Sequence, residues 1–92
     1  MITSILHKGL RKYYEEANGQ KLPPSQLKKI KRIFDILDAI SSERDIKSLG
    51  LGIHKLTGQY SGFWALTVTG NYRVIFRFSN GDVYDVDYLD YH

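Results

Sequence analysis

The first half of the chain carries apolar residues at the three- and four-residue spacing of an amphipathic helix. This pattern is longest after the Pro23-Pro24 pair, where it predicts a helix of about 17 residues that ends near Ser41. Its apolar positions are Leu27, Ile30, Ile33 or Phe34, Leu37 and Ile40. A shorter helical pattern runs from about Lys8 to Ala17 and stops at Asn18-Gly19, since both residues tolerate the left-handed backbone of a helix end. The preceding Ile2 to Leu6 is β-prone and could form an edge strand.

From Ile53 onward the apolar period changes to two, which is typical of strands. Four strands are predicted, at Ile53 to Leu56, Phe63 to Thr69, Tyr72 to Phe78, and Val83 to about Tyr91. Helices followed by such a meander predict an α+β fold, in which two N-terminal helices pack on one face of an antiparallel β-sheet. No linker, repeat or low-complexity tract divides the chain, so residues 1–92 are expected to form a single domain.

The alternation also predicts the loops between the last strands. The core-facing sets, which must share one side of the sheet, are Trp64, Leu66 and Val68, then Val74, Phe76 and Phe78, then Tyr84, Val86 and Tyr88. A two-residue Asn80-Gly81 loop would set Phe76 opposite Asp85 and mix the faces. A three-residue loop at 79–81 sets Phe76 opposite Tyr84 and keeps the apolar and polar faces of the sheet separate. The alternation therefore favours three-residue loops at 79–81 and, by the same parity, at 69–71.

The second face of this predicted sheet is the more polar one. It carries Thr67, Thr69, Arg73, Ile75, Arg77, Asp85, Asp87, Leu89 and Tyr91. In the three-residue register Arg73 lies opposite Asp87. Because the helices cover the other face, this one is left to solvent or to a ligand.

Composition narrows the class of protein. The chain has 92 residues, is 42% apolar and 25% charged, and contains no cysteine, so disulfides, thiolate metal sites and cysteine nucleophiles are excluded. No apolar run approaches the roughly 20 residues of a membrane span, and no signal-peptide core is present, so a cytoplasmic protein without membrane contact is expected. The net charge of +3 arises in residues 1–46, which is compatible with a polyanionic partner.

The candidate chemistry is that of RNA cleavage without a metal. No histidine pair has metal-ligand spacing, and Gly50-Leu51-Gly52 lacks the third glycine of a nucleotide loop. Cleaving RNA needs one group to take a proton from a ribose 2′-hydroxyl, one to return a proton to the leaving 5′-oxygen, and a cation for the phosphate. The chain offers His54 and His92 for the proton transfers, and it offers cations. The cations in question are Arg73, Arg77 and Lys55.

Each of these features also has an ordinary structural explanation. Arg73 opposite Asp87 could be a simple cross-strand ion pair, and a terminal histidine is usually a frayed end. His7 is expected to be a structural or exposed residue at a helix start. The run Lys28-Lys29-Lys31-Arg32 is either a solvated helix face or a contact to ribosomal RNA phosphates.

The C-terminal half carries a specific combination of motifs. Residues 62–78 read GFWALTVTGNYRVIFRF, and they are followed by Asn80-Gly81-Asp82 and the closing Asp90-Tyr91-His92. This combination resembles the HigB-type toxins, the "plasmid maintenance killer" branch of the RelE-like superfamily. The resemblance implies a microbial-RNase-like fold and a type II toxin that cuts mRNA in the ribosomal A site without metal or cofactor. The implied partners are a helix-turn-helix antitoxin (HigA-like), the ribosome and mRNA, with operator DNA reached only through the antitoxin complex.

The resemblance also implies roles for single residues. The catalytic positions that it assigns are His54, Arg73, Asp90, Tyr91 and His92, without deciding which histidine is the base and which the acid. Thr57 stands where the family usually has lysine, and Lys55 could supply a charge nearby if the strand continues. Lys55 and Arg77 are therefore expected to bind substrate. The alternative is a degenerate module that binds an antitoxin or regulatory partner without cleaving RNA.

Overall fold

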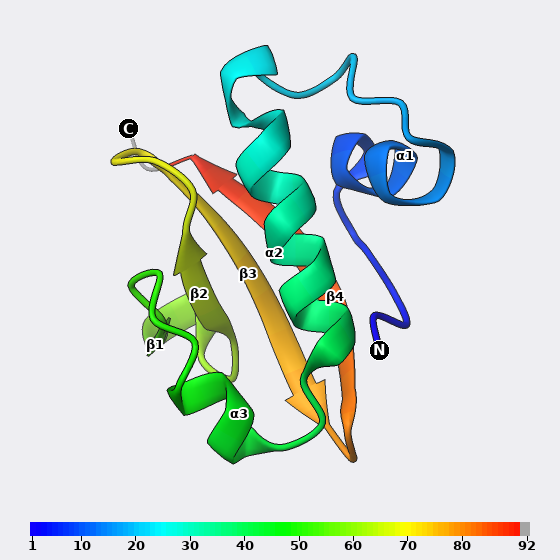
Figure 1. The fold of residues 1–92 in the computed structure, drawn as a ribbon. Coiled ribbons are helices and arrows are strands. Elements are labelled where there is room, and N and C mark those ends of the chain that lie inside the picture. The colour runs from blue at the N-terminus through cyan, green and yellow to red at the C-terminus, as the bar shows by residue number, and fades with distance from the viewer. Residues whose placement is uncertain (91–92) are drawn as a thin grey trace.

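The computed structural model describes residues 1–90, so Tyr91 and His92 lie outside the described residues. Figure 1 shows an antiparallel sheet with the helices on one of its faces, as the sequence predicts. The helices are α1 (Lys8–Glu16), the 3₁₀ turn η1 (Pro24–Gln26), α2 (Leu27–Ala39), α3 (Glu43–Lys47) and the 3₁₀ turn η2 (Gly58–Tyr60). The strands, in the sheet order β1-β2-β3-β4, are β1 (His54–Lys55), β2 (Trp64–Thr67), β3 (Tyr72–Ser79) and β4 (Asp82–Asp90). None of the helices in residues 1–90 has the length and apolarity to cross a membrane.

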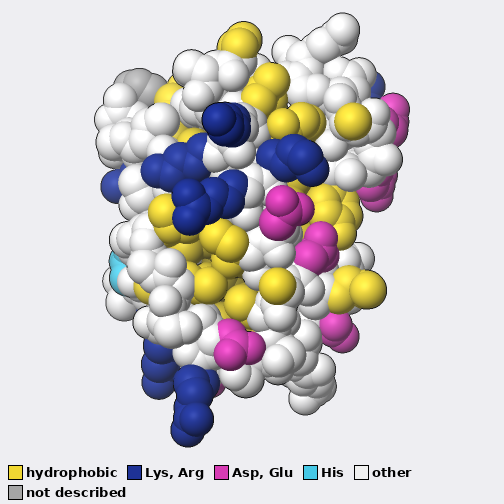
Figure 2. Space-filling view, in the orientation of Figure 1, with side chains coloured by type: hydrophobic (Ala, Val, Ile, Leu, Met, Phe, Trp, Pro, Cys, Tyr) yellow, Lys and Arg dark blue, Asp and Glu magenta, His cyan; other side chains and the backbone are white. Residues whose placement is uncertain are grey.

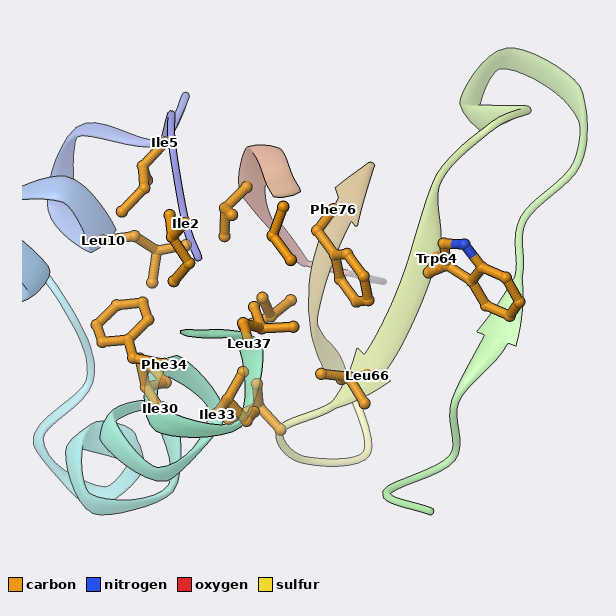
Figure 3. Close-up of a cluster of buried hydrophobic side chains, with 14 of the residues drawn as sticks. Ile2, Ile5, Leu10, Ile30, Ile33, Phe34, Leu37, Trp64, Leu66 and Phe76 are labelled. Carbon is orange, nitrogen blue, oxygen red and sulfur yellow. The ribbon is translucent and has the colours of Figure 1, made fainter. Parts of the chain in front are cut away.

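The main core forms where α2 packs on the sheet. Figure 3 shows the apolar face of this helix directed at side chains from β2 and β3. Ile33, Leu37, Leu66 and Phe76 are all fully buried in this cluster. Burying a large apolar side chain contributes about 1.5–3 kcal/mol, so this interface is the principal source of stability.

Helix α1 begins at a histidine cap. The Leu10 N–H donates to His7 Nδ1 at 3.1 Å, which satisfies one of the backbone donors left over at a helix start. The prediction of a structural His7 is therefore confirmed.

Helix α3 was not predicted, although its signal is in the sequence. Ser42 and Asp45 form a capping box, in which each side chain accepts from the backbone N–H of the other residue. Backbone donation from Ser41, followed by its hydroxyl and by Ser42, lowers the pKa of Asp45. No helix is predicted between Ser41 and Ile53, so this four-residue signature was missed.

The β2–β3 connection has the predicted three-residue turn. Trp64 pairs with Phe76 and Leu66 with Val74, so the next pair in register is Val68 with Tyr72. The Val68 N–H donates to the Tyr72 carbonyl at 2.9 Å. Residues 69–71 therefore form the loop, and the core faces of the two strands coincide.

The β3–β4 connection differs from the prediction. Ser79 pairs directly with Asp82, so the loop has two residues, Asn80 and Gly81. Their φ angles of 52° and 84° are both positive, as the tight hairpin turn that matches strand twist requires. The predicted three-residue loop at 79–81 is wrong. A different feature of the hairpin places the apolar residues of β3 and β4 on the same face.

This feature is a β-bulge in β4. The register shifts between Ile75 and Arg77, and Asp85 takes a positive φ of 53° there. The extra residue turns β4 over, so Val83 and Val86 are both fully buried in the core although they lie three positions apart. After the bulge, the apolar side chains of β4 again point to the core face of the sheet.

The bulge changes which residues face each other across the last hairpin. Tyr84 pairs with Arg77 and lies on the second face, not on the core face as predicted. Arg73 pairs with Leu89 rather than with Asp87, so the expected cross-strand pair of Arg73 and Asp87 is also wrong.

The N-terminal segment covers the outer edge of β4. Ile2 bridges Val83 and Ile5 bridges Val86, both in the parallel sense. The Leu6 N–H donates to the Val86 carbonyl at 2.7 Å. The predicted edge strand is thus realised as two isolated bridges, and the three-residue step from Ile2 to Ile5 matches the bulged step of β4.

A polar contact ties β4 to the start of α2. Gln26 is only 5% exposed, and the Tyr88 hydroxyl donates to its Oε1. Tyr88 also stacks on Tyr72 at a centroid distance of 5.2 Å. Burial is the main cause that raises the pKa of Tyr88 to about 12, with smaller contributions from Tyr72 and Asp90.

We expect Tyr88→Phe to lower the free energy of unfolding by about 1–3 kcal/mol, because it leaves a buried Gln26 oxygen without its donor. Tyr84→Phe is the matched control: it lies on the same strand, and its hydroxyl makes no hydrogen bond within residues 1–90. Urea unfolding of both variants measures the difference. A raised pKa stabilises the fold below pH 10 and the contribution is lost toward pH 12, so Tyr88→Phe should also flatten the alkaline fall in stability. Equal effects of the two variants would contradict this role of Gln26.

Candidate functional site

The face of the sheet that the helices leave uncovered carries three of the five predicted site residues that lie within residues 1–90. Strand pairing sets His54 beside Ala65, Ala65 beside Ile75, and Ile75 beside Asp87 in one row across this face. Strand alternation adds Arg73 and Arg77 to the same face. His54, Arg73 and Arg77 are therefore brought to one surface.

This second face is not uniformly polar. Phe63, Ala65 and Ile75 form a small buried cluster, against which Leu56, Tyr60 and Leu89 pack. The segment between β1 and β2, which includes η2, folds over it. The alternation did not predict this apolar cover, since it comes from a loop rather than from a regular element.

A tight turn before β1 fixes the orientation of His54. The Ile53 N–H donates to the Gly50 carbonyl at 3.0 Å, and the two residues between them, Leu51 and Gly52, have φ angles of 54° and 68°. His54 Nδ1 lies 2.8 Å from the Gly52 carbonyl oxygen. A carbonyl can only accept, so Nδ1 carries the hydrogen in this contact. Neutral His54 then holds its lone pair on Nε2, on an exposed side chain.

The same turn is clamped onto β2. The Thr67 N–H donates to the Leu51 carbonyl at 2.8 Å. A Cβ at Gly52 would lie 2.5 Å from Thr67 Oγ1, closer than a real Cβ approaches any atom. Gly52 is therefore required both for its backbone conformation and for close approach to Thr67. At this glycine pair the sequence excludes a nucleotide loop but does not reveal the positioning role.

Arg73 is held at the β2–β3 turn. Its Nη1 donates to the carbonyls of Thr69 at 2.6 Å, Tyr72 at 3.1 Å and Gly70 at 3.2 Å. Three carbonyl acceptors on one nitrogen fix the guanidinium at this end of the sheet. Sheet spacings place its Cα about 12 Å from that of His54, two strands across and two residues along. A phosphodiester can lie between two side chains of these lengths.

The end of β4 lies beside the same turn. Asp90 pairs with Tyr72, and Figure 1 shows the end of β4 next to the β2–β3 connection. Alternation puts the Asp90 side chain on the face of Tyr88, which agrees with its part in raising the pKa of Tyr88. Asp90 is thus adjacent to Arg73 along the sheet edge but on the other face. The predicted roles of Tyr91 and His92 fall outside the described residues.

Arg77 lies on the second face as part of a packed group. Its guanidinium carbon is 4.4 Å from the centroid of the Phe63 ring, and its Nε is 3.7 Å from an Asp85 oxygen. A Cβ at Gly62 would lie 2.9 Å from Arg77 Nη1, so glycine makes room for the guanidinium there. Arg77 therefore braces the bulge and the loop over the apolar cluster.

Lys55 lies on the opposite side of the sheet from His54. Its Nζ is 3.6 Å from Glu43 Oε1 and 5.0 Å from the centroid of the Trp64 ring. Strand β1 ends at Lys55, so it does not continue to Thr57 as the sequence-based hypothesis required. The structure does not bring Lys55 together with His54. Among residues 1–90, no group of three histidine, aspartate or glutamate side chains could hold a metal ion.

The chain is similar to known proteins over its whole length. Residues 3–92 match the family described as the RelE-like toxin of the type II toxin–antitoxin system HigB. The chain is 39% identical to the Endoribonuclease HigB of Proteus vulgaris, covering all of both chains. It is 32% identical to Toxin HigB-1 of Vibrio cholerae serotype O1, covering all of this chain and 98% of the relative. The YoeB–YefM complex from Staphylococcus aureus contains a similar fold, with a TM-score of 0.65 and 15% identity, over 100% of this chain and 95% of that one.

We expect Gly52→Ala to lower the free energy of unfolding by about 2–4 kcal/mol, because it combines left-handed strain with the contact to Thr67. Gly50→Ala is the control: its φ is 71°, but nothing lies within 4 Å of an added Cβ, so it should cost only about 1 kcal/mol. Thermal unfolding compares the two, and ¹⁵N NMR of the imidazole reports whether Nδ1 still carries the hydrogen. Adding Thr67→Ala should recover part of the loss. Equal losses at the two glycines would contradict the clamp.

Proposed function

This chain belongs to the HigB family of RelE-like toxins of type II toxin–antitoxin systems and is an endoribonuclease toxin, and we propose that it cuts mRNA in the ribosomal A site and so stops translation. The observation that carries the proposal is the state of His54. Its Nδ1 is bonded to the Gly52 carbonyl, which leaves Nε2 as an exposed acceptor on the open sheet face.

In the proposed reaction His54 Nε2 takes the proton from a ribose 2′-hydroxyl. The 2′-oxygen then bonds to phosphorus, and the bond from phosphorus to the 5′-oxygen breaks, which leaves a 2′,3′-cyclic phosphate and a 5′-hydroxyl. A histidine whose second nitrogen is bonded to a carbonyl is oriented for this task and stabilised as it becomes cationic. Among residues 1–90, this is the histidine that lies on the open face.

Arg73 is the residue proposed to stabilise the phosphate. Its position at the β2–β3 turn, on the face of His54, puts a permanent cation where charge grows on the phosphate oxygens. We propose His92 as the acid that protonates the 5′-oxygen, Tyr91 as a group that positions the 2′-hydroxyl, and Asp90 as a residue that orients the chain end. The support for these three roles is the family resemblance and the placement of Asp90 next to the strand of Arg73.

Ribosome dependence follows from the openness of the site. His54 is exposed on a sheet face, so the chain supplies little of the positioning that holds a flexible RNA in line. The ribosome would supply it, and purified protein should cleave isolated RNA poorly. We propose a helix-turn-helix antitoxin as the neutralising partner, operator DNA as a target of the complex alone, a single domain over residues 1–92, and the cytoplasm as the site of action.

The alternative is a degenerate module that binds its partner without cleaving RNA. The observation in its favour is Thr57, where family members usually have lysine, together with the ion pair that Lys55 makes with Glu43. An induction experiment separates the two functions.

We expect tightly controlled induction of the wild-type chain to arrest growth, and His54→Ala and His92→Ala to relieve the arrest. Removing an acid or base should slow mRNA cleavage on purified ribosomes about a hundredfold or more. His7→Asn is the matched histidine control, since its side-chain oxygen can still cap α1. Growth arrest by neither the wild type nor any variant would leave the binding module as the function.

We expect Lys55→Ala to change mRNA cleavage less than about threefold, because Lys55 pairs with Glu43 in solvent on the face away from His54. Single-turnover cleavage on programmed ribosomes measures the rate, with His92→Ala as the inactive reference. A loss comparable to that of His92→Ala would instead mean that Lys55 replaces the missing family lysine.

A further inference from the structure

A groove on the helix side of the molecule carries a one-signed charge. It lies between the first half of α2 and the turn before β1, encloses about 460 Å³, and is separate from the face of His54. It is lined by Ser25, Lys28, Lys29, Arg32, Ile33 and Leu51. Figure 2 shows Lys and Arg side chains gathered over this part of α2 beside exposed hydrophobic atoms. The groove therefore combines a cationic rim with an apolar floor.

The three cations of the rim lack carboxylate partners within residues 1–90. The ion pairs in that part of the chain are made by Lys55 and Arg77. The opposite flank of α2 is different, because Lys31 there shares a hollow with Asp35. Positive charge is thus concentrated on one flank of the helix. The like charges of Lys28 and Arg32, four residues apart, weaken the helix unless an anionic partner binds.

The start of α2 adds to the positive electrostatic potential of the groove. Its first turn contains Lys28 and Lys29 and no acidic residue, and no side chain caps its N-terminus. Cations at a helix N-terminus oppose the helix dipole. The whole groove end of α2 is therefore positive, from the backbone as well as from side chains.

Leu51 forms the apolar side of the groove although its backbone is strained. Leu51 is half-buried with a φ of 54°, a conformation that glycine or asparagine adopts with less strain. It stands between Gly50 and Gly52, so the chain keeps one large apolar side chain in a turn otherwise made of glycines. Part of that side chain packs on the core, and the rest lines the groove.

We propose that this groove is the docking site of an acidic amphipathic segment of the antitoxin. An apolar side chain of that segment packs against the exposed part of Leu51, above the buried Ile33, and its Asp or Glu residues pair with Lys28, Lys29 and Arg32. The apolar floor favours such a peptide over RNA, since phosphates need the cations but not Leu51. The inference rests on the toxin–antitoxin part of the proposed function.

Affinity measurements with purified antitoxin, obtained by co-expression with this chain and then separated, test the groove. Arg32→Glu should weaken binding about tenfold or more, chiefly through repulsion of the acidic segment. Lys31→Glu is the control, because it makes the same charge change one residue away on the opposite flank of the helix. Leu51→Asn, which suits the positive φ, should also weaken binding, which loss of charge alone would not predict.

The other outcomes overturn the inference in distinguishable ways. Unchanged antitoxin affinity of Arg32→Glu and Leu51→Asn would mean that the antitoxin binds elsewhere. Unchanged affinity with lost binding to 70S ribosomes would make the groove an RNA contact. If the wild-type chain itself did not bind the antitoxin, the proposed partner would be wrong and the inference would fall with it. Circular dichroism of each variant ensures that losses are not caused by unfolding.

Discussion

The one-residue bulge at Asp85 is the constraint on which the sheet depends. With a two-residue turn at Asn80-Gly81 and no bulge, Val86 would point to the wrong face, and the bulge returns it to the core. The same step lets Ile2 and Ile5 pack beside Val83 and Val86, so the sheet edge is covered by the start of the chain. Because the bulge sets the register of everything after it, it also decides that Asp90 ends beside Tyr72.

The fold was largely predictable from the sequence, and the wrong predictions for the last hairpin share one cause. The long apolar repeat of α2 and the alternation of the strands were read correctly, because both patterns report burial directly. The loop at 79–81 was predicted wrongly since parity has two physical solutions, a longer loop or a bulge, and apolar spacing alone does not distinguish them. The Asn80-Gly81 dipeptide favoured the short turn. The Asp85 N–H donates to Ser4 Oγ, 81 residues away in the sequence, and apolar spacing does not report such a contact.

The candidate site was predictable as a set of residue types but not as an arrangement. Family resemblance selected His54 and Arg73, and the strand register brings both to one face. It did not reveal that Lys55 faces away from His54, which follows from strand alternation because the two residues are neighbours in β1. Nor could it reveal the turn that orients His54, because that turn depends on one glycine meeting Thr67.

In a trans peptide the carbonyl and the N–H point in opposite directions. The bond from the Ile53 N–H to the Gly50 carbonyl therefore decides that the ring of His54 meets the Gly52 oxygen. Rotating this one peptide plane by half a turn would present an N–H to the ring instead. Nδ1 would then accept, and the outward-facing Nε2 would carry the hydrogen. The same imidazole would change from a proton acceptor to a proton donor, so its chemical polarity is encoded in the main chain and not in any side chain of the site.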